Sequence, residues 1–372
     1  LAQNLMATAA GQRALLRGAA ILGQELRLMD SADQRRATVA YLLQVLEGLV
    51  TGNTISASAR RRAAELIPGV CSDALELRAL GDDPRRAVAR CDGMLVLVRT
   101  ELRSSPRLHA ARLQLALYQR DELGEAARAA RQLEHMLLDL DLPTEGVALV
   151  RLTLGETYFA DGDTARGRTV LTRLGRDTEL RRAAGHAHFH LARLDLAGGH
   201  YATARDRFAA CALDNPGASY ANNALELGLL VAEELENPTG GPAVLDLYAP
   251  VVYYDLTRHP QRRRESLAVF VSTAAVMVDL RERQNLLERG RWELAELAAA
   301  AGDTARALDL FDTITHDHAD GRYPAAALAA TGRLHAASGR TDRARNALER
   351  LLAQYPDYLF ADEIRDRLRS LL

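Results

Sequence analysis

The residues whose type and spacing come closest to a chemical site are the histidines of the segment HAHFH. His186 and His190 are four positions apart, so on a helix they would share one face, a spacing that two zinc ligands use. His188 would point to another side, and no third ligand follows nearby. The segment HDHAD, residues 316–320, offers further polar groups at an expected helix end. Both patterns are more typical of packed or solvated histidines, so we predict no metal and no cofactor.

Catalytic patterns are also missing from the sequence. All 47 basic residues are arginines, and without lysine the chain has no phosphate-loop lysine and no pyridoxal Schiff base. No serine lies in a G-x-S-x-G elbow. Glu233 and Glu234 are adjacent, so on one helix they point to different faces and do not form an acid–base pair. We therefore predict that the protein is not an enzyme.

The charge balance argues against two classes of partner. The chain of 372 residues has 49 acidic and 47 basic side chains, for a net charge of −2. Such a balance produces no field that would gather nucleic acid or anionic lipid. The longest apolar run, residues 267–278, is shorter than the roughly 18 residues that a membrane span needs. We expect no nucleic-acid partner and no direct membrane span.

Small residues spaced 12 positions apart indicate the secondary structure of the chain. Gly155 and Gly167 flank Gly162 at this spacing, and three further segments repeat it. The flanking pairs there are Ala192 with Ala204, Ala295 with Ala307, and Gly332 with Ala344. Two antiparallel helices joined by a glycine turn would bring such positions face to face, where only Gly or Ala fits. The pattern predicts helical hairpins, which become stable by stacking.

The larger residues of these segments resemble the tetratricopeptide repeat. The resemblance is carried by LGETY (154–158), by ATARDRF (202–208) with Pro216, and by RARNAL (343–348) with Pro356. It implies an all-α fold, a right-handed superhelical solenoid of antiparallel helix hairpins. An unrelated helical bundle is the alternative.

We divide the chain into four parts on this pattern. Residues 1–105 are expected to be helical with degenerate repeats or none, and residues 106–257 to hold tetratricopeptide-like repeats. Residues 258–284 supply one helix where a pair is expected, so we assign an irregular helical connection there. Residues 285–372 are expected to hold two repeats and a C-terminal capping helix.

The loops that lead from one repeat to the next narrow the resemblance. Three of them read NPGASYANNAL (215–225), ADGRYPAAAL (319–328) and YPDYLFADEI (355–364). In this respect residues 145–372 resemble tetratricopeptide proteins of bacterial cell envelopes, such as outer-membrane-assembly lipoproteins and the Tol–Pal accessory protein. The resemblance implies a periplasmic or envelope-associated location. Cytoplasmic relatives carry similar loops, so a cytoplasmic location stays open.

The resemblance also implies a concave groove, lined by the first helix of each hairpin. Its lining residues in this sequence are Leu149, Leu152, Glu156, Phe159, His186, Phe189, Arg193, Leu196, Asn222, Leu225, Leu229, Arg289, Trp292, Glu296 and Arg333. Trp292 is flanked one turn away by Arg289 and Glu296, which suits an anchor for a partner segment. The alternative for Trp292 is ordinary packing between adjacent repeats, and the pattern does not separate the two.

The chain contains three cysteines, of which two are placed symmetrically. Cys71 and Cys91 each lie ten residues from Gly81, so antiparallel helices meeting there would set the two thiols opposite each other. In an oxidising compartment a disulfide is feasible if the Cα atoms come within about 7 Å. Two buried free thiols are the alternative.

The sequence as a whole predicts a scaffold that binds a protein or peptide partner in its concave groove, within a bacterial envelope complex. A structural subunit that stacks end to end into an oligomer or filament is one alternative. The chain begins at Leu1 without methionine, so a scaffold or sensor segment of a longer protein is another.

Overall fold

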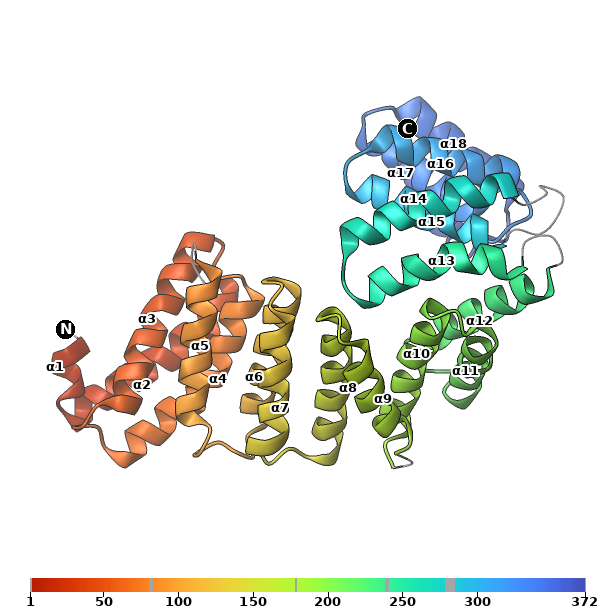
Figure 1. Cartoon of the computed structure of the whole chain (residues 1–372). Coiled ribbons are helices and arrows are strands. Elements are labelled where there is room, and N and C mark those ends of the chain that lie inside the picture. The colour runs from red at the N-terminus through yellow and green to blue at the C-terminus, as the bar shows by residue number, and fades with distance from the viewer. Residues whose placement is uncertain (1, 80–82, 178, 238–240, 278–284, 372) are drawn as a thin grey trace. The chain divides into compact units, whose positions relative to one another are not determined.

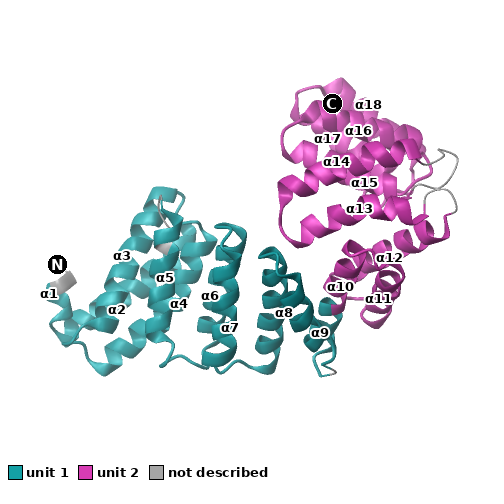
Figure 2. Ribbon diagram, in the orientation of Figure 1, with its two compact units in different colours: residues 1–187 teal, residues 188–372 magenta. Residues whose placement is uncertain are grey.

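The computed structural model describes residues 2–79, 83–177, 179–237, 241–277 and 285–371. Helices joined by turns make up these residues, and no strand occurs among them, so the all-α prediction is confirmed. The chain divides into two compact units, residues 1–187 and 188–372, and the boundary lies inside helix α10 (Figure 2).

Consecutive helices pack as hairpins within each unit (Figure 1). Unit 1 contains α1 (Ala2–Met6), α2 (Ala9–Glu25), a 3₁₀ turn (Leu26–Leu28), α3 (Ala32–Thr51), α4 (Ala57–Glu76), α5 (Pro84–Val98), α6 (Pro106–Asp121), α7 (Ala126–Asp139), α8 (Thr144–Ala160), α9 (Thr164–Gly175) and the first part of α10 (Arg181–Ala197). Unit 2 contains the rest of α10 and then α11 (Tyr201–Asp214), α12 (Ala221–Glu236), α13 (Gly241–Leu256), α14 (Pro260–Met277), α15 (Asn285–Ala300), α16 (Thr304–Asp317), α17 (Pro324–Ala337), α18 (Thr341–Gln354) and α19 (Ala361–Ser370).

Several hairpins share a turn of the same backbone geometry, with a glycine at one position. Its glycines are Gly162, Gly199, Gly302 and Gly339, with φ between 71° and 81°. In each case the next N–H donates to the carbonyl four residues before the glycine, as from Asp163 to Tyr158 at 2.9 Å. Glycine reaches this left-handed conformation without steric cost. The side chain of Asp163 then caps α9 by accepting from the N–H of Arg166.

The turn between α13 and α14 has the same geometry without a glycine. Arg258 takes the left-handed position with φ 54°, and the N–H of His259 donates to the carbonyl of Tyr254 at 2.9 Å. Helix α14 then packs along α13 and also against α15. From the sequence we assigned residues 258–284 to an irregular helical connection with one helix and no repeat. In the structure the helix of this segment pairs with α13, and the pairing was missed because the turn before α14 carries no glycine. Residues 278–284 lie outside the described residues.

The close approach of helices explains the small residues 12 positions apart. A Cβ on Gly155 would lie 2.5 Å from Cγ of Leu171, and one on Gly332 would lie 2.5 Å from Cδ2 of Leu348. Among the alanines of the pattern, the fully buried ones are Ala192, Ala204, Ala295, Ala307 and Ala344. Side chains of the second helix therefore fill the space that a larger residue would need.

Helix α19 has one buried face and one charged face. In α19, Ala361 and Ile364 are buried and face the rest of unit 2. The exposed residues of α19 include Asp362, Glu363, Arg365, Asp366 and Arg367. A helix with such a charged outer face suits the end of a stack. None of the helices that the structure describes is long and apolar enough to cross a membrane.

Cys71 on α4 and Cys91 on α5 lie next to each other in the core of unit 1. Both are fully buried, and Sγ of Cys71 lies 4.0 Å from the carbonyl oxygen of Cys91. The structure holds them as free thiols. The hydrogen bond with Cys91 and burial raise the pKa of the Cys71 thiol well above its ordinary value. Gly81, the expected centre of symmetry, lies outside the described residues.

Candidate binding surfaces

A groove of about 600 Å³ lies between α8 and the first half of α10, entirely within unit 1. We call it the α8–α10 groove. Its lining residues are Glu145, Ala148, Leu149, Leu152, Glu179, Leu180, Arg181, Arg182, Ala183 and His186. The structure thus brings together three residues that the sequence assigned to one surface, namely Leu149, Leu152 and His186.

The exposure of the two leucines divides the α8–α10 groove into floor and rim. Leu152 is 8% exposed and belongs to the floor, whereas Leu149 is 49% exposed. Charged side chains of both signs, including Glu145 and Arg182, border this apolar patch. An apolar patch with a charged border suits contact with a partner segment that has one apolar side chain and polar neighbours.

Phe159 and Glu156, also expected in the groove, have other roles. Phe159 is 1% exposed, and its ring occupies the space beside Gly167, where an added Cβ would lie 2.5 Å from Cε1 of the ring. The assignment of Phe159 to the groove was therefore wrong, because the glycine opposite lets the ring turn into the hairpin. Glu156 accepts a hydrogen bond from the nearly buried Arg120 at 3.3 Å.

Phe189 belongs to the core of unit 2 rather than to a free surface. Its ring stacks on Tyr220 with centroids 5.7 Å apart and meets Phe208 at 6.0 Å. The guanidinium of Arg193 lies 5.8 Å from the centre of the same ring. The predicted contact role of Phe189 is thus wrong, because the ring of Tyr220, from the loop before α12, covers it.

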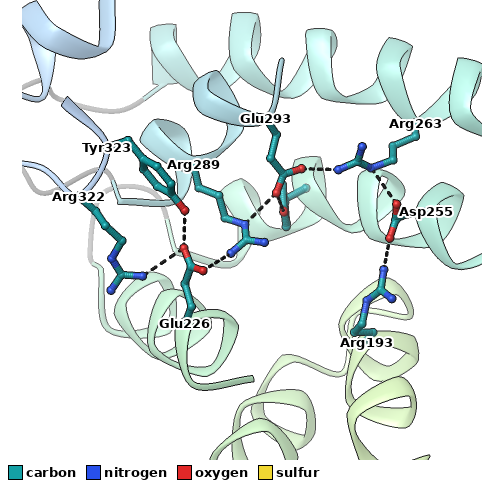
Figure 3. A network of polar contacts seen from close by, with 9 residues as sticks. Arg193, Glu226, Asp255, Arg263, Arg289, Glu293, Arg322 and Tyr323 are labelled. Carbon is teal, nitrogen blue, oxygen red and sulfur yellow. Dashed lines mark hydrogen bonds and ion pairs between the residues drawn. The ribbon is translucent and has the colours of Figure 1, made fainter. Parts of the chain in front are cut away.

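Arg193 and Arg289, both predicted to meet a partner, belong to a chain of alternating charges inside unit 2 (Figure 3). In order, its members are Arg193, Asp255, Arg263, Glu293, Arg289, Glu226 and Arg322. They come from α10, α12, α13, α14, α15 and the loop before α17. We call this set the arginine–carboxylate network.

The distances within the arginine–carboxylate network are those of hydrogen-bonded ion pairs. Arg263 approaches Asp255 at 3.1 Å and Glu293 at 2.6 Å. Arg289 approaches Glu293 and Glu226 at 2.9 Å each. The hydroxyl of Tyr323 also donates to Glu226. Because these charges satisfy one another, a partner that used Arg193 or Arg289 would have to displace a carboxylate.

Two opposing effects act on the pKa of the Glu226 carboxyl, burial and the neighbouring donors. Burial alone would raise the pKa of this carboxyl, but the charge of Arg289 and the hydrogen bond from Tyr323 outweigh burial and lower the pKa. Glu226 and Glu293 were not predicted from the sequence as members of a site. Each directly follows a predicted groove residue, Leu225 and Trp292 respectively, and that adjacency is a signal that could have found them.

Trp292 packs between two aromatic rings. It lies 5.4 Å from Phe311 and 5.3 Å from Tyr323, with an angle of 17° between the planes of the indole and Tyr323. Of the two alternatives left open by the sequence, the structure supports packing between repeats. The exposed members of the predicted groove in unit 2 are Asn222, Leu225, Leu229, Glu296 and Arg333.

The histidine-rich segments hold no metal site among the described residues, where no group of three potential ligands converges. In HDHAD, Asp317 and His318 both contact the buried Arg291, at 2.9 Å and 2.8 Å. Burial and then the charge of Arg291 lower the pKa of His318 to about 4. We interpreted this segment as polar loop residues, and the structure instead shows two of them holding a buried arginine.

The hairpins α15–α16 and α17–α18 contain the small-residue spacing and the glycine turns described above. Residues 298–362 match the family model of the tetratricopeptide repeat. This tetratricopeptide segment comprises 65 of the 372 residues and includes α16, α17 and α18. It supports the resemblance for the C-terminal part of the chain.

The similar solved structures include two that share 13% identity with this chain. One is a tetratricopeptide repeat protein from Parabacteroides merdae, with 83% of this chain and 98% of that chain covered and a TM-score of 0.33. The other is Rap protein complexed with competence and sporulation factor, with 97% of each chain covered and a TM-score of 0.32. No curated protein matches the sequence.

Proposed function

We propose that the protein is a non-enzymatic scaffold that holds a protein or peptide partner. The observation that carries the proposal is the α8–α10 groove, where the half-exposed Leu149 lies above an apolar floor of Leu152 and its neighbours. The match of the tetratricopeptide segment supports an interaction role, because stacked helical repeats expose extended surfaces for partners.

The chemistry of the α8–α10 groove indicates the kind of segment it would take. Its volume of about 600 Å³ is within the range of small ligand sites, and its floor is apolar. An aliphatic side chain of the partner would contact Leu149 and Leu152, while polar neighbours would meet the acidic and basic residues at the border.

A matched pair of substitutions tests this proposal. Leu149→Arg places a charge in the groove, and Leu138→Arg places the same charge on α7, where Leu138 is 79% exposed and lines no described groove. Peptides selected from a random 12-residue display library on the native protein should bind Leu149→Arg at least tenfold more weakly. Their affinity for Leu138→Arg should be unchanged. Equal affinity for native protein and Leu149→Arg would refute the assignment of this groove.

We propose further that the scaffold works in a bacterial cell-envelope complex, in the periplasm. Support comes from the three loops with a Pro or Gly, an aromatic residue and then alanine, at residues 215–225, 319–328 and 355–364. The test is fractionation of the source organism with the full-length protein detected by antibody. Release by osmotic shock would support the proposal, and recovery with cytoplasmic enzymes would contradict it.

A further inference from the structure

A cleft of about 470 Å³ lies in unit 2, between α13 and the turn that joins α10 to α11. We call it the tyrosine cleft. It is separate from the α8–α10 groove, which belongs to unit 1. Its lining residues are Ala197, Gly198, Gly199, Tyr201, Asp246, Ala249, Pro250, Tyr253 and Tyr254. None of them was assigned to a site from the sequence.

One face of α13 forms a wall of the tyrosine cleft. Asp246, Pro250 and Tyr253 are spaced four and three positions apart, so they share this face. The opposite wall includes Gly198 and Gly199, which have no side chains. The cleft stays open because nothing larger than a hydrogen atom projects from the turn at these two positions.

Asp246 supplies a carboxylate that forms no ion pair with any residue that the structure describes. The carboxylate accepts a hydrogen bond from the hydroxyl of Tyr201, a residue that is only 8% exposed. Burial and this hydrogen bond raise the pKa of the Tyr201 hydroxyl, which keeps the hydroxyl protonated as a donor. Asp246 itself is exposed, so a ligand can reach a carboxylate that a buried residue holds in position.

The backbone of α13 adds a second acceptor beside this carboxylate. Pro250 lies inside the helix and has no N–H, so the main-chain oxygen of Asp246, four positions earlier, lacks the usual helical donor. Among the described residues, neither an arginine nor a histidine lines the tyrosine cleft. Acceptors without a basic neighbour in the lining favour a cationic ligand over an anion.

Two aromatic rings of the lining meet nearly at a right angle. The ring centroids of Tyr253 and Tyr254 are 5.4 Å apart, with 73° between the ring planes. The face of an aromatic ring attracts a cation, and rings placed around a cation recognise quaternary ammonium groups. The guanidinium of Arg262, which is not part of the lining, lies 5.8 Å from the centre of the Tyr254 ring. This ring thus already makes one cation–π contact within the fold.

The composition of the tyrosine cleft distinguishes an organic cation from a metal ion. Calcium takes six to eight oxygen ligands, whereas the cleft offers a single carboxylate. No group of three potential metal ligands occurs in the part of the chain that the structure describes. The rings of Tyr253 and Tyr254 instead provide apolar surface for alkyl groups next to a charge. An ammonium group that carries methyl or other alkyl substituents combines these two properties.

We propose that the tyrosine cleft binds an alkylated ammonium group. The cation lies against the rings of Tyr253 and Tyr254, and the carboxylate of Asp246 neutralises its charge. A small molecule such as choline and a methylated lysine of a partner protein both present this group, and the experiment distinguishes them. The proposal goes beyond the scaffold function and does not depend on the α8–α10 groove.

The test titrates the whole chain with choline and with 3,3-dimethylbutan-1-ol, in which carbon replaces the charged nitrogen. Ligand-observed NMR measures both affinities, and we expect the neutral analogue to bind at least tenfold more weakly. Asp246→Asn keeps an acceptor for Tyr201 but removes the charge, and Tyr253→Leu removes a ring, so each should weaken choline binding about tenfold. Asp214→Asn is the matched control, because Asp214 is exposed at the end of α11 and lies outside the lining. Leu149→Arg, in the other unit, should also leave choline binding unchanged.

A peptide that contains trimethyllysine, compared with its unmodified copy, identifies the source of the ammonium group. Tighter binding of the trimethylated peptide than of choline would assign the cleft to a partner side chain, and tighter binding of choline would assign it to a small molecule. The proposal is overturned if neither ligand binds, if choline and its neutral analogue bind equally, or if Asp246→Asn and Tyr253→Leu both keep native affinity. Any of these results would leave the proposed scaffold function standing, because that function is tested at Leu149.

Discussion

The indole of Trp292 stacks on the ring of Tyr323, and Phe189 stacks on Tyr220 in the same way. The centroids are 5.3 Å and 5.7 Å apart, and the interplanar angles are 17° and 22°. Both pairs join residues 31 positions apart, so the loop leading to a later helix supplies the ring that covers an earlier one. These aromatics hold neighbouring helices of unit 2 together.

Replacing Trp292 with alanine should therefore lower the stability of unit 2. Removal of a large, partly buried aromatic residue costs about 3 kcal/mol of unfolding free energy. Urea denaturation followed by circular dichroism measures this, with Glu296→Ala, an exposed neighbour one turn later, as control. If Trp292→Ala leaves the midpoint of urea unfolding unchanged and weakens peptide binding, Trp292 contacts a partner and does not stabilise the packing.

Arg258→Gly should stabilise the protein. Arg258 has φ 54° in the turn before α14. In this region a residue with a side chain is less stable than glycine by about 1 kcal/mol. The same change at the exposed helical residue Arg262 should destabilise by about 1 kcal/mol, because glycine is a poor helix former. Thermal melting compares the two variants, and a lower melting temperature for Arg258→Gly would contradict the turn geometry.

The arginine–carboxylate network should make the free energy of unfolding depend on pH. The lowered pKa of Glu226 stabilises the fold at pH values above about 4.5, its ordinary value, and this contribution is lost as pH falls through the lower folded value. Glu226→Gln should thus lose about 1–2 kcal/mol at pH 7 and little at pH 3. Urea titrations at both pH values check this against Glu236→Gln, an exposed change at the end of α12. A loss that is the same at both pH values would argue against the ion pairs.

Glu234 should have the opposite effect on stability, lowering the free energy of unfolding as pH rises. It is 5% exposed, its Oε2 has no hydrogen-bond partner in the described structure, and burial followed by the charge of Glu233 raises its pKa to about 7. A carboxyl with a raised pKa costs stability as pH rises from about 4.5 to 7, because the folded state releases its proton later. Glu234→Gln should gain about 1–2 kcal/mol over the native protein at pH 8 and less at pH 5. A constant difference in unfolding free energy from pH 5 to 8 would rule this out.

Cys71 and Cys91 should respond together to a disulfide reagent. Refolding from urea in a glutathione redox buffer lets the two thiols pair by exchange with oxidised glutathione, which is reduced to two equivalents of thiol. The expected product is a monomer that is 2 Da lighter and has one free thiol, Cys211, and Cys71→Ser should prevent its formation. Three free thiols after refolding would show that the neighbouring helices do not bring the sulfurs into bonding geometry.

Local chemistry made the hairpins predictable from sequence. A glycine turn needs a left-handed residue at one position, and a close approach needs Gly or Ala at two, so Gly155, Gly162 and Gly167 indicate a hairpin without knowledge of the rest. The same reasoning failed at Arg258, where a non-glycine residue takes the left-handed position, so the turn is evident only from the folded backbone and from the packing of α14 on α13.

Tertiary structure decided which side chains remain free to meet a partner. The residue type and helical register of Phe189 and Trp292 suited contact residues, but rings 31 positions later cover both. Arg193 is paired with Asp255, 62 positions away. Sequence alone determined the helical hairpins, since their turns and close approaches depend on neighbouring residues. Exposure, ion pairing, the α8–α10 groove and the tyrosine cleft depend on contacts between distant segments, so only the folded chain determined them.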